Sequence, residues 1–254
     1  MSAVVPMTKP GMSDAEWQTR CDLASLYHIC EYFGWTDTIN QHLSARVPGE
    51  PEHFLINNYG EMFDEVTASS LIKMDMDGNV VGSSGRFNNA GFIIHSGVYK
   101  ARPDANCVLH THTRASAGVS LLSAGLRPIS QDVLSIYDDI AYHPYGVPAT
   151  VEECEELGKT CQKGGHVILH NHGLLTAAPT LPGALRGLYM LERACEIEVM
   201  SRQLGEEPVM IDDYIVKRAA QRMKQLRSDP SYGVVYFEAL KRQVKKQGGT
   251  DWAQ

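Results

Sequence analysis

The sequence predicts a single α/β domain with helices on both faces of a mixed sheet. Its 254 residues are enough for one large core, and 43% are hydrophobic and 21% charged, as in ordinary globular proteins. Strand patterns and helix patterns mix along the whole chain, with no Pro/Gly/Ser-rich linker and no repeat. The turn Asp77-Gly78-Asn79 lies between two strand patterns and predicts a hairpin, so the sheet is not purely parallel.

The elements of the first half follow from caps, turns and periodicity. Residues 1–12 carry two prolines and a glycine and are expected to form a flexible tail. Ser13 then caps a helix with an apolar stripe, which ends at Gly34. The other elements expected here are strands over residues 44–47, 53–57, 71–76 and 80–82, and a helix capped by Asn88 or Asn89 that runs through Tyr99.

Helix patterns dominate the second half. Thr150 caps a helix to Lys163, with Glu153 at the capping-box spacing. Residues 128–148 are expected to be loop, with one strand near 140–142. The other expected elements are strands over 108–112 and 167–173 and helices around 115–124 and over 181–204, 212–226 and 236–246. Residues 13–254 are thus interpreted as one domain, with 205–254 as a helical C-terminal extension.

Charge and cysteine usage exclude several classes of protein. The net charge is −7, from 23 basic and 30 acidic residues, which argues against a nucleic-acid or membrane partner. The six cysteines form no C-x-x-C pair and most lie in apolar periodic segments, as buried thiols of a reducing compartment do. The N-terminus does not read as a signal peptide, and no apolar run is long enough to span a membrane. A cytoplasmic protein is expected.

The most informative segment is Val108-Leu109-His110-Thr111-His112, an apolar strand with two histidines at its end. Residues i and i+2 lie on one face of a strand, about 7 Å apart at the backbone, so both imidazoles can reach one metal ion. Two buried imidazoles without a shared cation would each need a hydrogen-bond partner. His95, in the preceding helix, is expected to be a satisfied helix histidine, with a supporting role behind the ligands as the alternative.

A second histidine-tipped strand, Val167-Ile168-Leu169-His170-Asn171-His172-Gly173, follows about 60 residues later. Strand alternation cannot choose between His170 and His172, but Gly173 permits a sharp turn and favours His172 at the tip. Three histidines leave coordination positions open, which is typical of a catalytic metal site. Neutral imidazoles suit Zn²⁺ as well as Fe²⁺, Mn²⁺, Co²⁺ or Ni²⁺.

Longer stretches of the chain resemble a known family. Asn89-Ala90-Gly91-Phe92 through His95, Arg102-Pro103-Asp104-Ala105 with the first histidine strand, and Ile168 through Leu175 are similar to the class II aldolase/adducin family over roughly residues 15–205. The resemblance implies a three-layer α/β/α sandwich with a largely antiparallel central sheet. It also implies homotetramers with active sites near subunit interfaces, and zinc held by three histidines that match His110, His112 and His172.

The departures from the family pattern concern the substrate side of the site. The family aldolases carry a glutamate as general acid/base where this chain has Gly91, and glycine cannot transfer a proton. Asn89 and Ala90 replace serines that grip the substrate phosphate there. The early phosphate loop is replaced by Gln41-His42-Leu43-Ser44, and the next one by Asn57-Asn58-Tyr59-Gly60. This pattern resembles adducin heads and bacterial adducin-like proteins, although adducin heads lack some of the metal histidines.

Three functions are compatible with this pattern. The first is a metal-dependent carbon–carbon lyase on a small hydroxy/oxo or carboxylated substrate, with the metal as a Lewis acid that stabilises an enediolate-like intermediate. This first function includes the decarboxylation of an aromatic acid. The second is an iron-dependent oxygenase, because other members of the fold bind iron and activate oxygen. The third is a non-catalytic, adducin-like binding or scaffolding domain.

The remaining site residues are weaker candidates. A group that protonates the intermediate is needed in place of the glutamate, and Tyr59 and Tyr142 are the candidates, with Asp132, Tyr232 and Tyr236 behind them. Arg86 and Arg114 can hold a substrate carboxylate, and Asn89 and Gln131 can line the substrate cavity.

Overall fold

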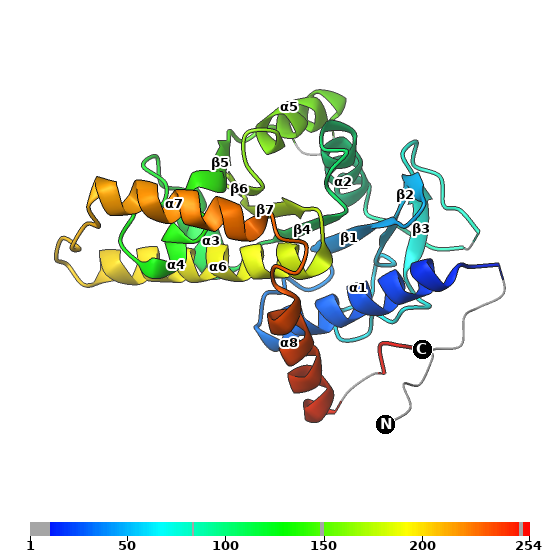
Figure 1. Ribbon diagram of the computed structural model, residues 1–254. Helices are drawn as coiled ribbons and strands as arrows, with labels where there is room; N and C mark the ends of the chain where they lie inside the picture. Colours follow the sequence, from blue (N-terminus) through cyan, green and yellow to red (C-terminus); the bar gives the residue numbers. More distant parts are fainter. Residues whose placement is uncertain (1–10, 83, 148–149, 249–250) are drawn as a thin grey trace.

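The computed structural model describes residues 11–82, 84–147, 150–248 and 251–254. A seven-stranded sheet forms its middle layer, in the order β3-β2-β1-β4-β7-β6-β5, and helices cover both faces (Figure 1). The strands are β1 (His42–Val47), β2 (Glu50–Ile56), β3 (Ile72–Asp75), β4 (Cys107–Thr111), β5 (Ile140–His143), β6 (His166–Leu169) and β7 (Gly173–Ala178). All neighbouring strands pair antiparallel except β5 and β6. The predicted three-layer α/β/α fold with a largely antiparallel sheet is confirmed.

Most helices begin at side-chain caps. The predicted caps Ser13, Asn88 and Thr150, and also Thr180, each accept a hydrogen bond from a backbone N–H in the first turn of a helix. The helices are α1 (Asp14–Tyr32), α2 (Asn89–Ala101), α3 (Arg114–Ser120), α4 (Gln131–Leu134), α5 (Val151–Cys161), α6 (Leu181–Gln203), α7 (Asp213–Arg227) and α8 (Val234–Gln247), with a 3-10 turn η1 (Tyr137–Asp139).

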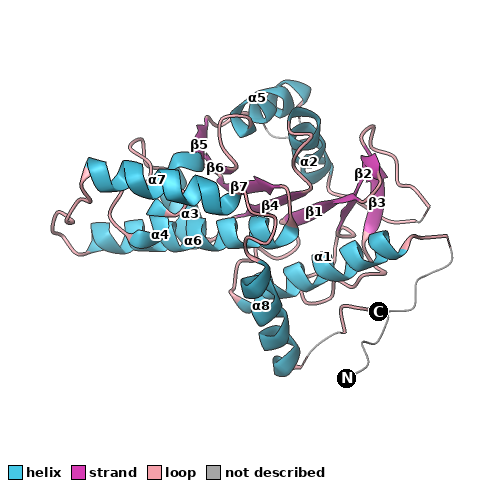
Figure 2. Ribbon diagram, in the orientation of Figure 1, coloured by secondary structure: helices cyan, strands magenta, loops and turns pink. Residues whose placement is uncertain are grey.

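The two faces of the sheet are covered by different helices (Figure 2). One apolar cluster joins α2 and α5 to side chains such as Val108 and Leu175. On the other face α1, α6 and α8 pack on residues such as Leu109, and a third cluster joins α3, α4 and α6 to the β6–β7 pair. Because successive residues of β4 alternate between these clusters, His110 faces the α2 side together with Val108.

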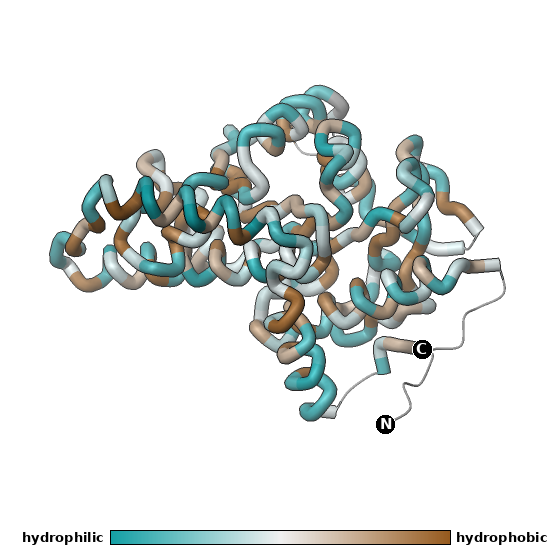
Figure 3. The backbone as a smooth tube through the Cα atoms, viewed as in Figure 1, coloured by the Kyte–Doolittle hydropathy of each residue, from teal (hydrophilic) through white to brown (hydrophobic). Residues whose placement is uncertain are grey.

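In the view of Figure 1, α7 lies above the part of α6 that extends beyond the sheet, and α4 contacts both helices. The described side chains of α7 are all at least partly exposed, and the last turns of α8 are hydrophilic (Figure 3). No helix among the described residues is both long and apolar enough to cross a membrane. The six cysteines are free, and all but Cys154 are buried.

Four predictions about individual elements were wrong. The expected loop over 128–148 contains α4, capped by Ser130, and η1. The expected hairpin strand over 80–82 is a single bridge between Met74 and Val80. The helix expected to reach residue 124 ends at Ser120. The second histidine strand ends at Leu169, and an unpredicted strand, β7, begins at Gly173. The expected tail over residues 1–12 lies almost entirely outside the described residues.

Candidate metal centre

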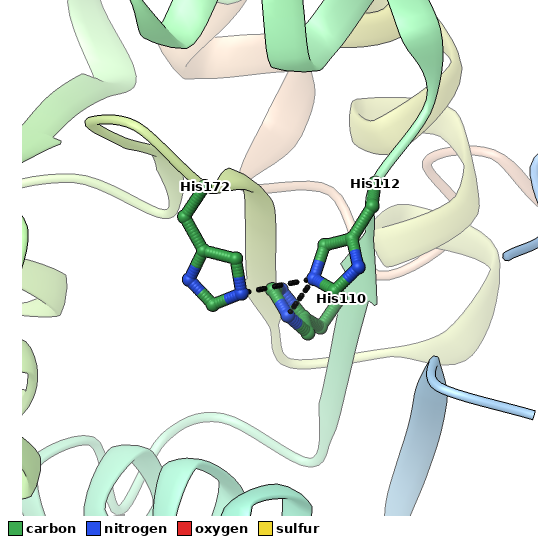
Figure 4. A group of neighbouring side chains, drawn as sticks. All are labelled: His110, His112 and His172. Atoms are coloured by element: carbon green, nitrogen blue, oxygen red, sulfur yellow. Dashed lines mark hydrogen bonds between the residues drawn. The ribbon is translucent and has the colours of Figure 1, made fainter. Parts of the chain in front are cut away.

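Three histidines converge at one end of the central strands (Figure 4). His110 is on β4, His112 follows the end of that strand, and His172 precedes β7. His112 Nε2 lies 2.7 Å from His110 Nε2 and 2.9 Å from His172 Nε2. Strand pairing of Thr111 with Leu174 explains why residues 60 positions apart in sequence meet here.

A tight turn between β6 and β7 selects His172 over His170. Asn171 has a left-handed backbone with φ of 59°, a conformation that asparagine tolerates better than most side chains. The turn therefore sends its two flanking histidines in different directions. The His170 ring shares a 3.0 Å hydrogen bond with the Ser120 carbonyl and stacks on Tyr142, whereas His172 joins His110 and His112.

In His110 and His112 the second ring nitrogen, Nδ1, has a polar neighbour outside the cluster. His110 Nδ1 donates to the Leu174 carbonyl at 2.7 Å, which leaves Nε2 without its proton and directed at the cluster. His112 Nδ1 lies 3.4 Å from a carboxylate oxygen of Asp37. Such partners fix the tautomer and the ring direction of metal-binding histidines.

The donor set fits a divalent cation. Burial holds the pKa of His110 well below its usual value and lowers the pKa of His172 to about 4, so both rings are neutral and can donate a lone pair. A single ring nitrogen of His112 cannot satisfy two other nitrogens by hydrogen bonding, because it carries either one proton or one lone pair. A cation shared by the three nitrogens removes this conflict, and three imidazoles are a common set for zinc.

A second pair of buried histidines lies beside the cluster and was missed in part by sequence reasoning. The His42 ring packs against His110 at 5.1 Å between centroids, and His42 Nδ1 shares a 2.7 Å hydrogen bond with His95 Nε2. His95 is also hydrogen-bonded to Ser44, whose hydroxyl lies 2.8 Å from that of Tyr99. Both ring nitrogens of His95 thus have partners, as expected of a satisfied helix histidine, and these partners are His42 and Ser44 rather than the three clustered histidines. His42 had no signal beyond its place beside a strand.

Gly91 leaves the space that His42 fills. A Cβ atom on Gly91 would lie 2.6 Å from His42 Cδ2 and 2.9 Å from His42 Nε2, closer than real Cβ contacts. At Gly91, where the family aldolases carry the glutamate, the His42 imidazole therefore fills the volume next to the backbone.

The two candidate tyrosines are exposed to a similar degree and differ in their hydrogen bonds. The Tyr142 hydroxyl accepts a 2.9 Å hydrogen bond from the Leu126 N–H, and partial burial of the side chain raises the pKa of Tyr142. The Tyr59 N–H donates to the Arg86 carbonyl at 2.8 Å, so these two candidates lie on adjoining loops beyond β2.

The other candidates lie at helix starts. Asn89 is the exposed first residue of α2, two residues before Gly91 and its contact with His42. Arg114 is the exposed first residue of α3, two residues after His112. Gln131 is the exposed first residue of α4, which packs on α6 and α7.

An enclosed cavity adjoins the cluster on its β5 side. It is lined by His172, His170, His143, Glu153 and apolar side chains of α2 and α5, and its volume is about 20 Å³. That is room for a water molecule rather than for a substrate.

Comparison with known proteins places these features in one family. The model of the class II aldolase and adducin N-terminal domain matches residues 21–199. A protein of Caulobacter vibrioides named "Putative aldolase class 2 protein" is 42% identical over 205 residues, 80% of each chain. Mouse alpha-adducin is 44% identical over 185 residues, 71% of this chain but 25% of adducin. The structure of an L-fuculose 1-phosphate aldolase from Glaciozyma antarctica PI12 superposes with a TM-score of 0.81 at 26% identity, covering 96% of this chain and 97% of that one.

Proposed function

Since this chain belongs to the class II aldolase and adducin family, we propose that it is a metal-dependent carbon–carbon lyase for a small hydroxy/oxo or carboxylated substrate. The convergence of three imidazole nitrogens, two of the distances being 2.7 and 2.9 Å, is the observation that carries this proposal. His110, His112 and His172 would hold the metal, with zinc as the best match and Fe²⁺, Mn²⁺, Co²⁺ or Ni²⁺ as alternatives. The family also leads us to propose a homotetramer.

Different residues around the bound metal are proposed to bind the substrate and to donate a proton. When bound, the metal supplies a Lewis acid that stabilises negative charge as a carbon–carbon bond breaks. His42 commits Nδ1 to His95, so its Nε2, next to Gly91, is the nitrogen left to hydrogen-bond a ligand. Arg114, exposed two residues after His112, is placed to attract a substrate carboxylate. Tyr59 and Tyr142 are the proposed proton donors; the Tyr142 hydroxyl accepts from the Leu126 N–H, which leaves its own proton free to be donated.

Metal content and bond cleavage test the proposal together. We expect elemental analysis to find about one zinc or similar ion per chain in the wild type and in His170→Ala, but not in His172→Ala. His170 is a matched control because it lies in the same turn and faces Ser120. Metal-dependent release of an aldehyde or of CO₂ from a panel of hydroxy and oxo acids should follow the same order. A wild type that binds no metal under metal-replete conditions would overturn the proposal, and ferrous-dependent oxygen uptake would redirect it to an oxygenase.

A non-catalytic binding domain of adducin type is the second candidate. It is favoured by the lack of a carboxylate at Gly91 and by the 44% identity with mouse alpha-adducin. Stoichiometric metal without turnover of any tested acid, and normal stability of His110→Ala/His112→Ala, would support it over the lyase.

A further inference from the structure

A buried carboxylate lies behind the strand that carries two of the three histidines. Glu192, on α6, is 1% exposed. The Thr111 hydroxyl donates to its Oε1 at 2.7 Å, and the Thr113 hydroxyl donates to its Oε2 at 2.6 Å. The two oxygens of one carboxylate therefore hold the residues on either side of His112.

Strand alternation explains why Glu192 binds this segment on the face opposite to the histidines. His110 and His112 point towards α2, so Thr111 and Thr113 point towards α6. Thr113 also caps α3 by accepting from the Ser116 N–H, and this ties the same backbone to the next helix. The segment that presents His112 lies just beyond the last ladder pair, Thr111 with Leu174, where strand pairing no longer fixes it.

Packing alone does not account for Glu192. Burial raises its pKa to about 7, and the two threonine hydrogen bonds oppose that rise only in part. Among the described residues no lysine or arginine forms an ion pair with it, whereas Glu198, also on α6 and fully buried, pairs with Arg127 and Arg202. An apolar side chain would fill this place without the cost of burying a polar group.

We propose that Glu192 is a positioning residue of the metal centre, which fixes the backbone on both sides of His112 and thereby the direction of its ring. This inference rests on the proposed metal binding by the three histidines. This role depends on two hydrogen bonds from the side chain of residue 192 and not on its charge. A glutamine can therefore replace the glutamate, because it offers one acceptor and one donor to the two threonine hydroxyls.

Metal affinity and ligand geometry test the proposal without an activity assay. We expect Glu192→Ala to weaken Co²⁺ and Zn²⁺ binding about 10- to 100-fold, as loss of a supporting group usually does, and to change the visible absorption spectrum of bound Co²⁺. Glu192→Gln should bind within about threefold of the wild type, with an unchanged spectrum, because both contacts persist.

Glu198→Gln is the matched control, since it alters another buried carboxylate of the same helix away from the histidines. It should lower the thermal midpoint while metal affinity and the Co²⁺ spectrum stay as in the wild type. Metal affinity of Glu192→Ala within about twofold of the wild type, with only stability lost, would overturn the positioning role.

Thr111→Val provides a second route if Glu192→Ala does not fold. It removes one of the two contacts with little change in volume, and should weaken Co²⁺ binding in the same direction. Combined with Glu192→Ala, Thr111→Val should add no further loss, because Glu192→Ala already removes the Thr111 contact. Full affinity in Thr111→Val would count against the proposal. A wild type that binds no Co²⁺ would instead refute the proposed metal site, so the two failures are distinct.

Discussion

Buried histidines lie at both ends of the β6–β7 strand pair, but their surroundings differ. At one end His172 joins His110 and His112, and ring nitrogens approach to 2.7 and 2.9 Å. At the other end His166, which begins β6, is more deeply buried than His172, with Nδ1 3.4 Å from the Thr176 hydroxyl and Nε2 3.7 Å from Asp139.

The pKa values of the histidines do not distinguish the two ends. Burial lowers the pKa of His172 to about 4 and that of His166 to about 4 as well. The difference is convergence: three nitrogens meet at one end, while a single imidazole meets a carboxylate and a hydroxyl at the other. A histidine-rich core therefore indicates a metal site only where the free ring nitrogens point at a common position.

Removing one histidine from each end should produce the largest contrast. We expect His110→Ala to weaken Zn²⁺ binding by at least about 100-fold, more than loss of a supporting group costs, because a direct ligand is gone. His166→Ala should leave metal affinity within about twofold and lower the free energy of unfolding by about 2 kcal/mol. Competition titration with a chromophoric chelator measures the affinities, and urea unfolding measures stability. Equal loss of metal in both variants would erase the distinction between the two ends.

Filling the space beside the metal end should have the next largest effect. Gly91→Ala places a Cβ 2.6 Å from the His42 ring, which His95 holds in place, and overpacking of this kind costs about 1–3 kcal/mol. Gly118→Ala is the control, since its Cβ would make an ordinary 3.5 Å contact with Val199 and alanine is the better helix former. In a His42→Ala background the cost of Gly91→Ala should largely disappear. If urea unfolding shows the same cost in both backgrounds, His42 is not what excludes a side chain at Gly91.

Sequence reasoning reached the histidines of the strands but not the residues that hold them. Alternation put His110 and His112 on one face because their spacing is local. His172 was favoured on account of Gly173, yet the structural reason is the left-handed Asn171 in a turn, which a strand pattern does not reveal.

The supporting residues are distant in sequence from their partners. His95 lies 53 residues from His42, and Glu192 lies 81 residues from Thr111, so only the tertiary fold brings them together. Strand β7 was missed because its apolar residues continue directly from the histidine strand, separated only by a turn of three residues. Local patterns predicted the helices on both faces of the sheet and the caps at Ser13, Asn88 and Thr150, whereas these long-range contacts had no local signature.

Lowering the pH should destabilise the folded protein through histidines near both ends of the β6–β7 pair. The effect should depend on bound metal at one of these ends. Burial lowers the pKa of His95 to about 3 and of His166 to about 4, against 6.5 for an exposed imidazole. The unfolded chain therefore binds more protons below pH 6.5, and stability is lost as pH falls from 6.5 towards these values, by about 1.4 kcal/mol per unit for each group.

Zn²⁺ should steepen this loss, because its ligands must stay unprotonated. Urea unfolding at pH 7, 6 and 5 measures the slopes. His166→Gln should flatten the slope by the same amount with and without Zn²⁺, since that histidine lies outside the cluster. An effect of His166→Gln that depends on Zn²⁺ would show that the two ends are coupled.

The smallest contrast concerns the carboxylate beside a histidine at each end. Asp37 lies 3.4 Å from His112 Nδ1 with a side chain that is 45% exposed, and Asp139 lies 3.7 Å from His166 Nε2. Pairs with an exposed partner contribute about 0–1 kcal/mol, so Asp37→Asn should weaken Zn²⁺ binding by no more than about fivefold. Asp139→Asn should not change Zn²⁺ affinity and should cost little stability, because the asparagine oxygen can still accept from the Gly165 N–H. A 100-fold loss in Asp37→Asn would mean that solvent does not screen this carboxylate in the metal-bound protein, and that Asp37 rather than the backbone held by Glu192 sets the direction of His112.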